Sequence, residues 1–319
     1  MIDPTVTVVV PTMFRHADLE RCLTALATMT TTPDRVLVVT RAEDIRSREI
    51  AAAHAADSVV VPRPGLAVAI ETGLRAATTE LAAFIDDDAR AHTDWLERAV
   101  RHFAADPALG FVAGRDNVHG DADSGSEDLV VGSLRRGKLR GNHHLGKGRA
   151  RPALHAKGAN MALRVAAVRD LPLGRMVRGQ GAQHGNELFL CFGALSRGYH
   201  GVYDPDVQVD HHPAARADND GRLEFSPERL DADVRNSAAA IGLYLGLSHW
   251  GLYLLRAVLV GDRNRPGLVW AAVHLLRRDP AGGRLAQVLR ASMRAPGDLR
   301  RLRGLTGPRP ARAAAAGTP

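Results

Sequence analysis

The sequence predicts an α/β fold, in which a mostly parallel sheet is flanked by helices and followed by a C-terminal helical extension. Short β-branched runs alternate with helical patterns over residues 6–113, and helical spacing continues from residue 227 to about residue 305. Strands that alternate with helices indicate a parallel sheet, because each crossover helix packs on one face of it. The length of 319 residues allows one large domain or two ordinary ones.

Each element follows from local composition and spacing. Short runs of β-branched and other apolar residues predict strands at residues 6–10, 36–40, 58–61, 81–85, 111–113, 201–203 and 207–209. Apolar residues at helical spacing predict helices at residues 19–29, 66–77, 95–105, 163–171 and 187–197. Asp94 and Glu97 have the spacing of a capping box at the start of the third helix. Residues 119–151 are rich in glycine and charge, which indicates a long loop with one short strand pair.

Charge is distributed unevenly along the chain. The formal net charge is +7, but residues 256–319 contain thirteen Arg and three Asp and carry +10, which leaves −3 for the rest. We expect a sheet domain over residues 1–225, a helical basic extension over residues 226–306 and a disordered tail over residues 307–319. The extension has neither a zinc-binding pattern nor a recognisable reading helix, so nucleic acid is not an expected partner.

The N-terminus has no positively charged start followed by a long apolar core, so a cytoplasmic location is expected. Residues 241–261 are apolar and long enough to cross a bilayer, but His249 and Arg256 interrupt them. Two other interpretations stay open. The segment can pack on the sheet domain, or it can lie at the inner face of the plasma membrane, where its aromatic residues and the arginines that follow fit an anionic surface. The aromatic residues are Tyr244, Trp250 and Tyr253.

Three consecutive acids, Asp86, Asp87 and Asp88, directly follow the strand predicted at residues 81–85. Ligands of parallel sheets bind beyond the carboxyl ends of the strands, so the acids stand where a site is expected. Adjacent carboxylates repel one another unless a cation or a donor-rich ligand compensates them. Mg²⁺ and Mn²⁺ suit carboxylates that share the ion with substrate phosphate oxygens. The alternative is a solvated turn that caps the next helix.

Four segments of the chain, taken in order, resemble the family 2 glycosyltransferases of GT-A fold, a Rossmann-like α/β fold. The segments are VVVPTMFR (8–15), AAFIDDDAR (82–90), KGANMALR (157–164) and HGNELFLCFGALSRGYHGVYDPDVQVDHH (184–212). The resemblance covers roughly residues 5–215 and makes residues 1–225 the catalytic domain. It implies inverting transfer of a sugar from a nucleotide-sugar donor to an acceptor hydroxyl. The acceptor would be a carbohydrate, a lipid-linked sugar or a small molecule, in polysaccharide, glycolipid or secondary-metabolite glycosylation.

The resemblance also implies roles for individual residues, each with a simpler structural alternative. Glu187 aligns with the general base and Asn186 with the acid before it, although an acid in the first turn of a helix is also favoured by the helix dipole. Asp88 and His211 would hold a divalent cation, Mn²⁺ or Mg²⁺, and His212 is an alternative ligand. The donor-binding residues implied are Pro11, Thr12, Arg15, Asp86, Asp87, Gly158, Ala159 and Asn160.

Two departures from the family pattern bear on the donor. Thr40 and Arg41 stand where many members have an acidic pair, and Glu43 and Asp44 follow slightly later. The acid that often reads a uracil is therefore missing or displaced, so the resemblance does not specify UDP. The family's Ala-Arg-Asn run is also altered and ends in Glu71. A GT-A nucleotidyltransferase and a catalytically silent relative that binds nucleotide sugars remain alternatives.

Overall fold

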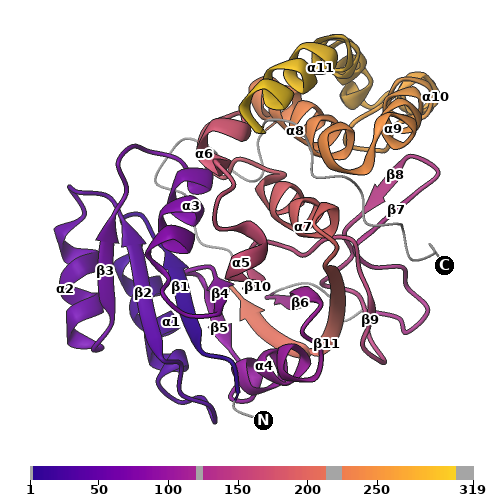
Figure 1. The fold of residues 1–319 in the computed structure, drawn as a ribbon. Coiled ribbons are helices and arrows are strands. Elements are labelled where there is room, and N and C mark those ends of the chain that lie inside the picture. The colour runs from indigo at the N-terminus through magenta and orange to yellow at the C-terminus, as the bar shows by residue number, and fades with distance from the viewer. Residues whose placement is uncertain (1–2, 120–124, 213–224, 307–319) are drawn as a thin grey trace.

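A computed structural model describes residues 3–119, 125–212 and 225–306 (Figure 1). Its main sheet has strand order β3-β2-β1-β4-β10-β6-β11-β5, with β9 paired to β11. All pairs are parallel except those made by β10, β5 and β9. The strands are β1 (Val6–Pro11), β2 (Arg35–Thr40), β3 (Asp57–Val60), β4 (Leu81–Ile85), β5 (Ala89–Ala91), β6 (Leu109–Val118), β9 (Arg151–Pro152), β10 (Asn160–Arg164) and β11 (His200–His211). The mostly parallel α/β sheet expected from the sequence is confirmed.

Helices cover both faces of this sheet, and more helices follow it at the C-terminal end of the chain (Figure 1). The helices that connect the strands are α1 (His16–Leu26), α2 (Ile45–Ala53), α3 (Leu66–Ala76), α4 (Trp95–Ala105), α5 (Val165–Val168), α6 (Leu173–Met176) and α7 (Asn186–Ser196). The extension contains α8 (Pro227–Ala240), the π-helix η1 (Ile241–Leu245), α9 (Leu247–Leu259), α10 (Leu268–Leu276), the 3₁₀-helix η2 (Pro280–Arg284) and α11 (Leu285–Thr306). The C-terminal helical extension is therefore confirmed.

Alternation along the strands divides the core into two layers. Val8 and Val10 of β1 belong to the cluster that includes Trp95 of α4, whereas Val9 belongs to the cluster that includes Phe189 of α7. Successive side chains of a strand point to opposite faces, so both faces of β1 are buried. A β-carbon on Gly73 would lie 2.5 Å from Val9, so only glycine allows α3 to approach β1 this closely.

Several local predictions differ from the structure. Residues 163–171 do not form one helix, because Leu163 lies in β10 between β4 and β6, and only Val165–Val168 is helical. Asp94 makes no capping hydrogen bond and instead accepts one from Arg98, so the predicted capping box is wrong. The two strands expected at 201–203 and 207–209 are one strand, β11, with an irregularity in the middle. Helix α2 was not predicted.

The loop prediction for residues 119–151 is largely correct. Strands β7 (Ser133–Arg135) and β8 (Lys138–Arg140) form the expected short pair, and residues 120–124 lie outside the described part. The sequence contains only two cysteines, Cys22 and Cys191, without a disulfide framework or a CxxC pattern, which predicts two buried reduced thiols. Both are buried and free in the structure.

The extension packs against the sheet domain. Ile241, Leu243 and Tyr253 lie in the same buried cluster as Phe189 and Phe192 of α7. Tyr244 and Trp250 also pack against this cluster, so the aromatic side chains proposed as membrane anchors face the protein. No helix within residues 3–119, 125–212 and 225–306 has the length and apolar character needed to cross a membrane. The tail at 307–319 lies outside the described residues.

Candidate active site

The carboxyl ends of β1, β4, β6 and β11 meet at one edge of the sheet, where the antiparallel β10 begins. Asn160 at the start of β10 is paired with Ile85 at the end of β4, and His211 at the end of β11 is paired with Val118 of β6. This topology brings together residues that are more than 100 positions apart in the sequence. The edge thus gathers the three acids after β4, the loop after β1 and the end of β11.

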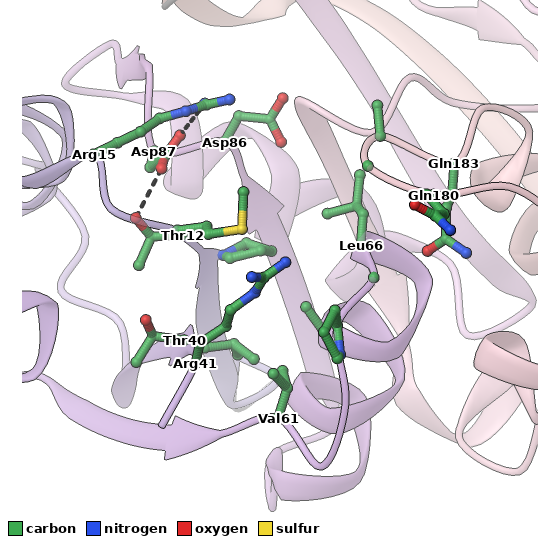
Figure 2. A pocket seen from close by; sticks show the side chains of 18 of the residues that line it. Thr12, Arg15, Thr40, Arg41, Val61, Leu66, Asp86, Asp87, Gln180 and Gln183 are labelled. Carbon is green, nitrogen blue, oxygen red and sulfur yellow. Dashed lines mark hydrogen bonds and ion pairs between the residues drawn. The ribbon is translucent and has the colours of Figure 1, made fainter. Parts of the chain in front are cut away.

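Asp87 ties the loop after β1 to the end of β4. Thr12 Oγ1 donates to one carboxylate oxygen at 2.8 Å, and Arg15 Nη1 donates to the other at 2.7 Å (Figure 2). Burial raises the pKa of Asp87 to about 7, and the Arg15 guanidinium opposes this rise. We treat the carboxylate as ionised because both of its oxygens accept hydrogen bonds, one from a guanidinium. Thr12, Arg15 and Asp87, all predicted to bind the donor, are therefore brought together.

Asp88 begins a second chain of polar contacts that runs through His211. The Nε2 atom of His211 lies 3.1 Å from Oδ1 of Asp88, and Nδ1 lies 2.9 Å from Oδ1 of Asp116. The other oxygen of Asp116 forms an ion pair with Lys157. Burial opposes protonation of His211, but bonding to Asp116 and Asp88 outweighs it and raises the pKa to about 9. The sequence analysis missed Asp116, although it lies in the same strand as the predicted 111–113 run and just beyond it.

Asp86, Asp88 and His211 each place a ligand atom within 4.8 Å of the others, which is the spacing of a cation site. Burial and the neighbouring Asp88 raise the pKa of Asp86, while the positive charges of His211 and Arg15 oppose the rise. Asp116 accepts from Nδ1 of His211 and so directs Nε2 toward the acids, as carboxylates do behind metal-bound histidines. Two carboxylates and an imidazole suit Mn²⁺, while the oxygen ligands alone suit Mg²⁺. The residues fit a divalent cation.

A cavity of about 510 Å³ opens beside Asp86 and Asp87. Its walls come from the loops after β1, β2, β3 and β4 and from residues 179–183 (Figure 2). Arg41, at the end of β2, points into the cavity, while Gln180 and Gln183 lie on the opposite wall. A cavity of this size suits a small polar ligand such as a nucleotide.

The displaced acid Asp44 does not line this cavity. It caps α2 by accepting from the amide of Ser47, and it also accepts from the amide of Phe14 at 2.6 Å and contacts His16 at 2.9 Å. These hydrogen bonds lower the pKa of Asp44 despite its burial. Asp44 therefore shapes the loop after β1, and the charged side chains that line the cavity beyond β2 and β3 are Arg41 and Arg63.

The sequence analysis also missed residues 179–183, which form one wall of the cavity. Gln183 accepts from the amide of Ala67 at 2.9 Å and so joins this loop to the first turn of α3. Gly179 and Gly181 have φ values of +96° and +64°, in the left-handed region that favours glycine. Glycines spaced two apart before a predicted helix were the available signal for such a turn.

The segment Gly158-Ala159-Asn160 lies at the site, but the side chain of Asn160 is used within the protein. Its Oδ1 accepts from Trp95 at 2.8 Å, and its Nδ2 donates to the carbonyls of Arg115 and Val207. Both amide hydrogens are thereby occupied in joining β6, β10 and β11. Ala159 is buried, whereas a β-carbon on Gly158 would meet open space. Contact of this segment with a donor sugar stays a prediction.

Glu187 stands in the first turn of α7, two residues after the left-handed Gly185 that caps the helix. Burial raises its pKa to about 7, and the positive charge of Lys157 partly opposes the rise. Lys157 thus acts electrostatically on both Glu187 and the pair of His211 with Asp116. Asn186 is buried, donates to the carbonyl of Gln183, and its Oδ1 accepts no hydrogen bond from the described residues.

His143, in the long loop after β6, contacts residues outside this cluster. His143 is buried and contacts the carbonyl of His155 at 2.9 Å, and its ring lies against that of Tyr203. Burial lowers the pKa of His143 to about 3, so it is neutral. Its role in the structure is packing beneath the loop.

A mixed sheet with an Asp-Asp-His cluster and a cavity at its carboxyl edge is the architecture of GT-A glycosyltransferases. The chain belongs to glycosyl transferase family 2, whose sequence profile matches residues 7–171. It is 30% identical over 221 residues to a pre-mycofactocin glycosyltransferase of Mycobacterium tuberculosis, which covers 65% of this chain and 42% of that protein. The chain therefore spans less than half the length of this relative. A glycosyltransferase of Mycobacterium bovis is 34% identical over 115 residues, or 36% of this chain and 50% of that protein.

Solved structures share the fold. GalNAc-T7, determined with UDP, GalNAc and Mn²⁺, superposes with a TM-score of 0.59 at 14% identity and covers 88% of this chain and 59% of that one. The mannosyltransferase PcManGT from Pyrobaculum calidifontis, determined with GDP-Man and Mn²⁺, gives a TM-score of 0.52 at 19% identity and covers 93% and 88%. At these identities the similarity establishes the GT-A fold and no more.

Proposed function

We propose that this protein transfers a sugar from a nucleotide-diphosphate donor to an acceptor hydroxyl by a single inverting displacement. The observation that carries the proposal is the cluster of Asp86, Asp88 and His211, in which Asp86 also lines the 510 Å³ cavity. A nucleotide in that cavity would extend its diphosphate toward these ligands. A divalent cation held by these three residues would neutralise charge on the leaving nucleoside diphosphate.

Glu187 is the base in this proposal. As the acceptor oxygen forms its bond to the anomeric carbon, the bond from that carbon to the diphosphate oxygen breaks, and the hydroxyl proton passes to the Glu187 carboxylate. A pKa of about 7 suits this step, because a base titrating near the working pH is both ionised and a good proton acceptor. Glu187 has one more methylene than the aspartate common in the family, so the acceptor is expected to sit farther from α7.

The donor end is assigned to the loops after β1 and β2. Arg15, held by Asp87, supplies positive charge beside the diphosphate position. Arg41 presents hydrogen-bond donors and makes no ion pair with the described residues, so it favours a base edge rich in acceptors, such as O6 and N7 of guanine. Pro11 and Thr12 line the cavity. The acceptor class and the cytoplasmic location stay predictions.

The test is release of nucleoside diphosphate from UDP-, GDP- and dTDP-sugars with Mn²⁺, Mg²⁺ or EDTA, run beside a thermal-shift panel with the same ligands. We expect one nucleotide to stabilise the protein in a cation-dependent manner and its sugar to be transferred or slowly hydrolysed. Glu187→Gln should abolish turnover and keep donor binding, while Glu80→Gln, an exposed acid away from the site, should change neither. Donor binding without turnover in every condition would favour the catalytically silent relative. Pyrophosphate release would favour a nucleotidyltransferase.

A further inference from the structure

Helix α10 carries a stripe of exposed apolar side chains. Leu268 and Val269 are 51% and 54% exposed, and Leu275 and Leu276 are 78% and 85% exposed. Ala272 between them is also exposed, so the spacing i, i+1, i+4, i+7, i+8 places all five on one face of the helix. A contiguous apolar face of this kind on a folded protein marks an interaction surface.

The orientation of α10 is set by its buried side. His274 is 2% exposed, and its ring nitrogens lie 2.9 Å from the carboxylate of Asp279 and 2.9 Å from the carbonyl of Arg263. These two contacts attach α10 to the segment before it and to the segment after it. The apolar stripe on the opposite side of the helix therefore faces outward. Figure 1 shows α10 at the periphery of the molecule, next to α9. Leu259 at the end of α9 is 44% exposed and precedes the turn into α10.

The charge around the stripe is positive. Four arginines of this hairpin, Arg256, Arg263, Arg277 and Arg278, form no ion pair with the described residues. The acids nearby are already used, since Asp262 pairs with Arg265 and Asp279 pairs with His274. Arg263 acts electrostatically on Asp279, so the hairpin combines an exposed apolar face with the positive charges of Arg256, Arg277 and Arg278, which form no ion pair within the described part of the chain. Anionic lipid headgroups over acyl chains complement both features.

We propose that α10, with the adjoining end of α9, docks this protein on an anionic membrane surface. The leucines of α10 enter the boundary between headgroups and acyl chains, and the arginines contact lipid phosphates. Helix α10 has nine residues, so it lies in the plane of the membrane and does not cross it. A second copy of the chain fits less well, because a symmetric contact through this face would bring the unpaired arginines of both copies to one interface. The inference does not rest on the proposed glycosyl transfer.

Vesicle sedimentation of the full chain tests the proposal. We expect binding to phosphatidylcholine vesicles that contain phosphatidylglycerol, and weaker binding to phosphatidylcholine alone or at high salt. The double variant Leu275→Asp with Leu276→Asp should lower the partition coefficient at least about tenfold, because two leucines that would be buried in the membrane are lost. Arg277→Gln with Arg278→Gln should remove most of the preference for anionic vesicles. Because all these side chains are exposed, the melting temperature should not change.

Met293→Asp is the matched control, since Met293 is 73% exposed but lies on α11 outside the stripe, and it should bind vesicles like the wild type. The proposal is overturned if the wild type stays in the supernatant with anionic vesicles, or if the leucine double variant sediments equally well. It is also overturned if light scattering shows a dimer that the leucine variant dissociates, because the face is then an interface between copies. No donor, cation or turnover enters the measurement, so its failure is distinct from failure of the proposed function.

Discussion

His211 lies between Asp88 and Asp116, with Nε2 3.1 Å from one carboxylate and Nδ1 2.9 Å from the other. The three residues come from three separate segments, the end of β4, β6 and β11. Asp116 fixes which ring nitrogen faces the acid pair, and Lys157 in turn holds Asp116. The cation ligands are therefore oriented by residues that would not touch the cation themselves.

Asp116→Asn should weaken Mn²⁺ binding in the presence of nucleotide by about 10- to 100-fold. A carboxylate behind a ligating histidine fixes the orientation of the ring and raises its basicity, and the variant loses both effects. Calorimetric titration with Mn²⁺ measures the effect. Asp210→Asn is a suitable control, since Asp210 is an exposed neighbour of His211 that contacts His92 instead. Equal affinities of the two variants for Mn²⁺ would show that His211 is not a ligand of the cation.

Asp87→Ala should destabilise the protein by about 2 to 4 kcal/mol, because it removes the closer of the two ion pairs of the partly buried Arg15 and the acceptor of Thr12. Urea unfolding measures the loss. Asp57→Ala provides the comparison, since its ion pair with Arg35 is exposed and should contribute less than about 1 kcal/mol. Similar losses at both positions would show that Asp87 does not organise the loop after β1.

The rate of transfer should fall as the pH is lowered through about 7. Burial raises the pKa of Glu187 to about 7, so the carboxyl group is protonated below that pH and cannot accept the acceptor proton. A pH profile of kcat with saturating cation measures the transition. A rate that stays constant down to pH 5 would mean that Glu187 is not the base, or that its pKa is not raised in the working complex.

Arg41→Ala should weaken binding of the preferred nucleotide by about 1 to 3 kcal/mol, the range for a paired arginine contact with a base edge. We expect GDP to bind the wild type more tightly than UDP, and the variant to lose most of this difference. Arg35→Ala is the control, since Arg35 begins β2, the strand that precedes Arg41, and its guanidinium pairs with Asp57 instead. Tighter binding of UDP, with no effect of Arg41→Ala, would contradict the assignment.

Much of the α/β core could be predicted locally. Residues 81–85 and 95–105 form the predicted strand and helix within the same bounds, because an apolar run before three acids and an apolar stripe at helical spacing are local signals. The prediction of a helix at residues 163–171 is wrong because long-range pairing decides the structure there. Their apolar pattern suits a helix, but pairing of Leu163 between β4 and β6 outweighs local propensity. Such pairing between distant strands leaves no local signal.

By itself the sequence determined the fold class, the position of Asp86, Asp87 and Asp88 after a strand and the helical nature of the extension, because each depends on neighbours within about ten residues. Only the tertiary structure decided which partner each acid contacts: Asp87 forms the closer ion pair with Arg15, and Asp88 faces His211. It also decided that Asp44 is engaged in the protein and that Arg41 faces the cavity. Those outcomes depend on which strand ends meet at one edge of the sheet, and such meetings are set by long-range pairing and burial.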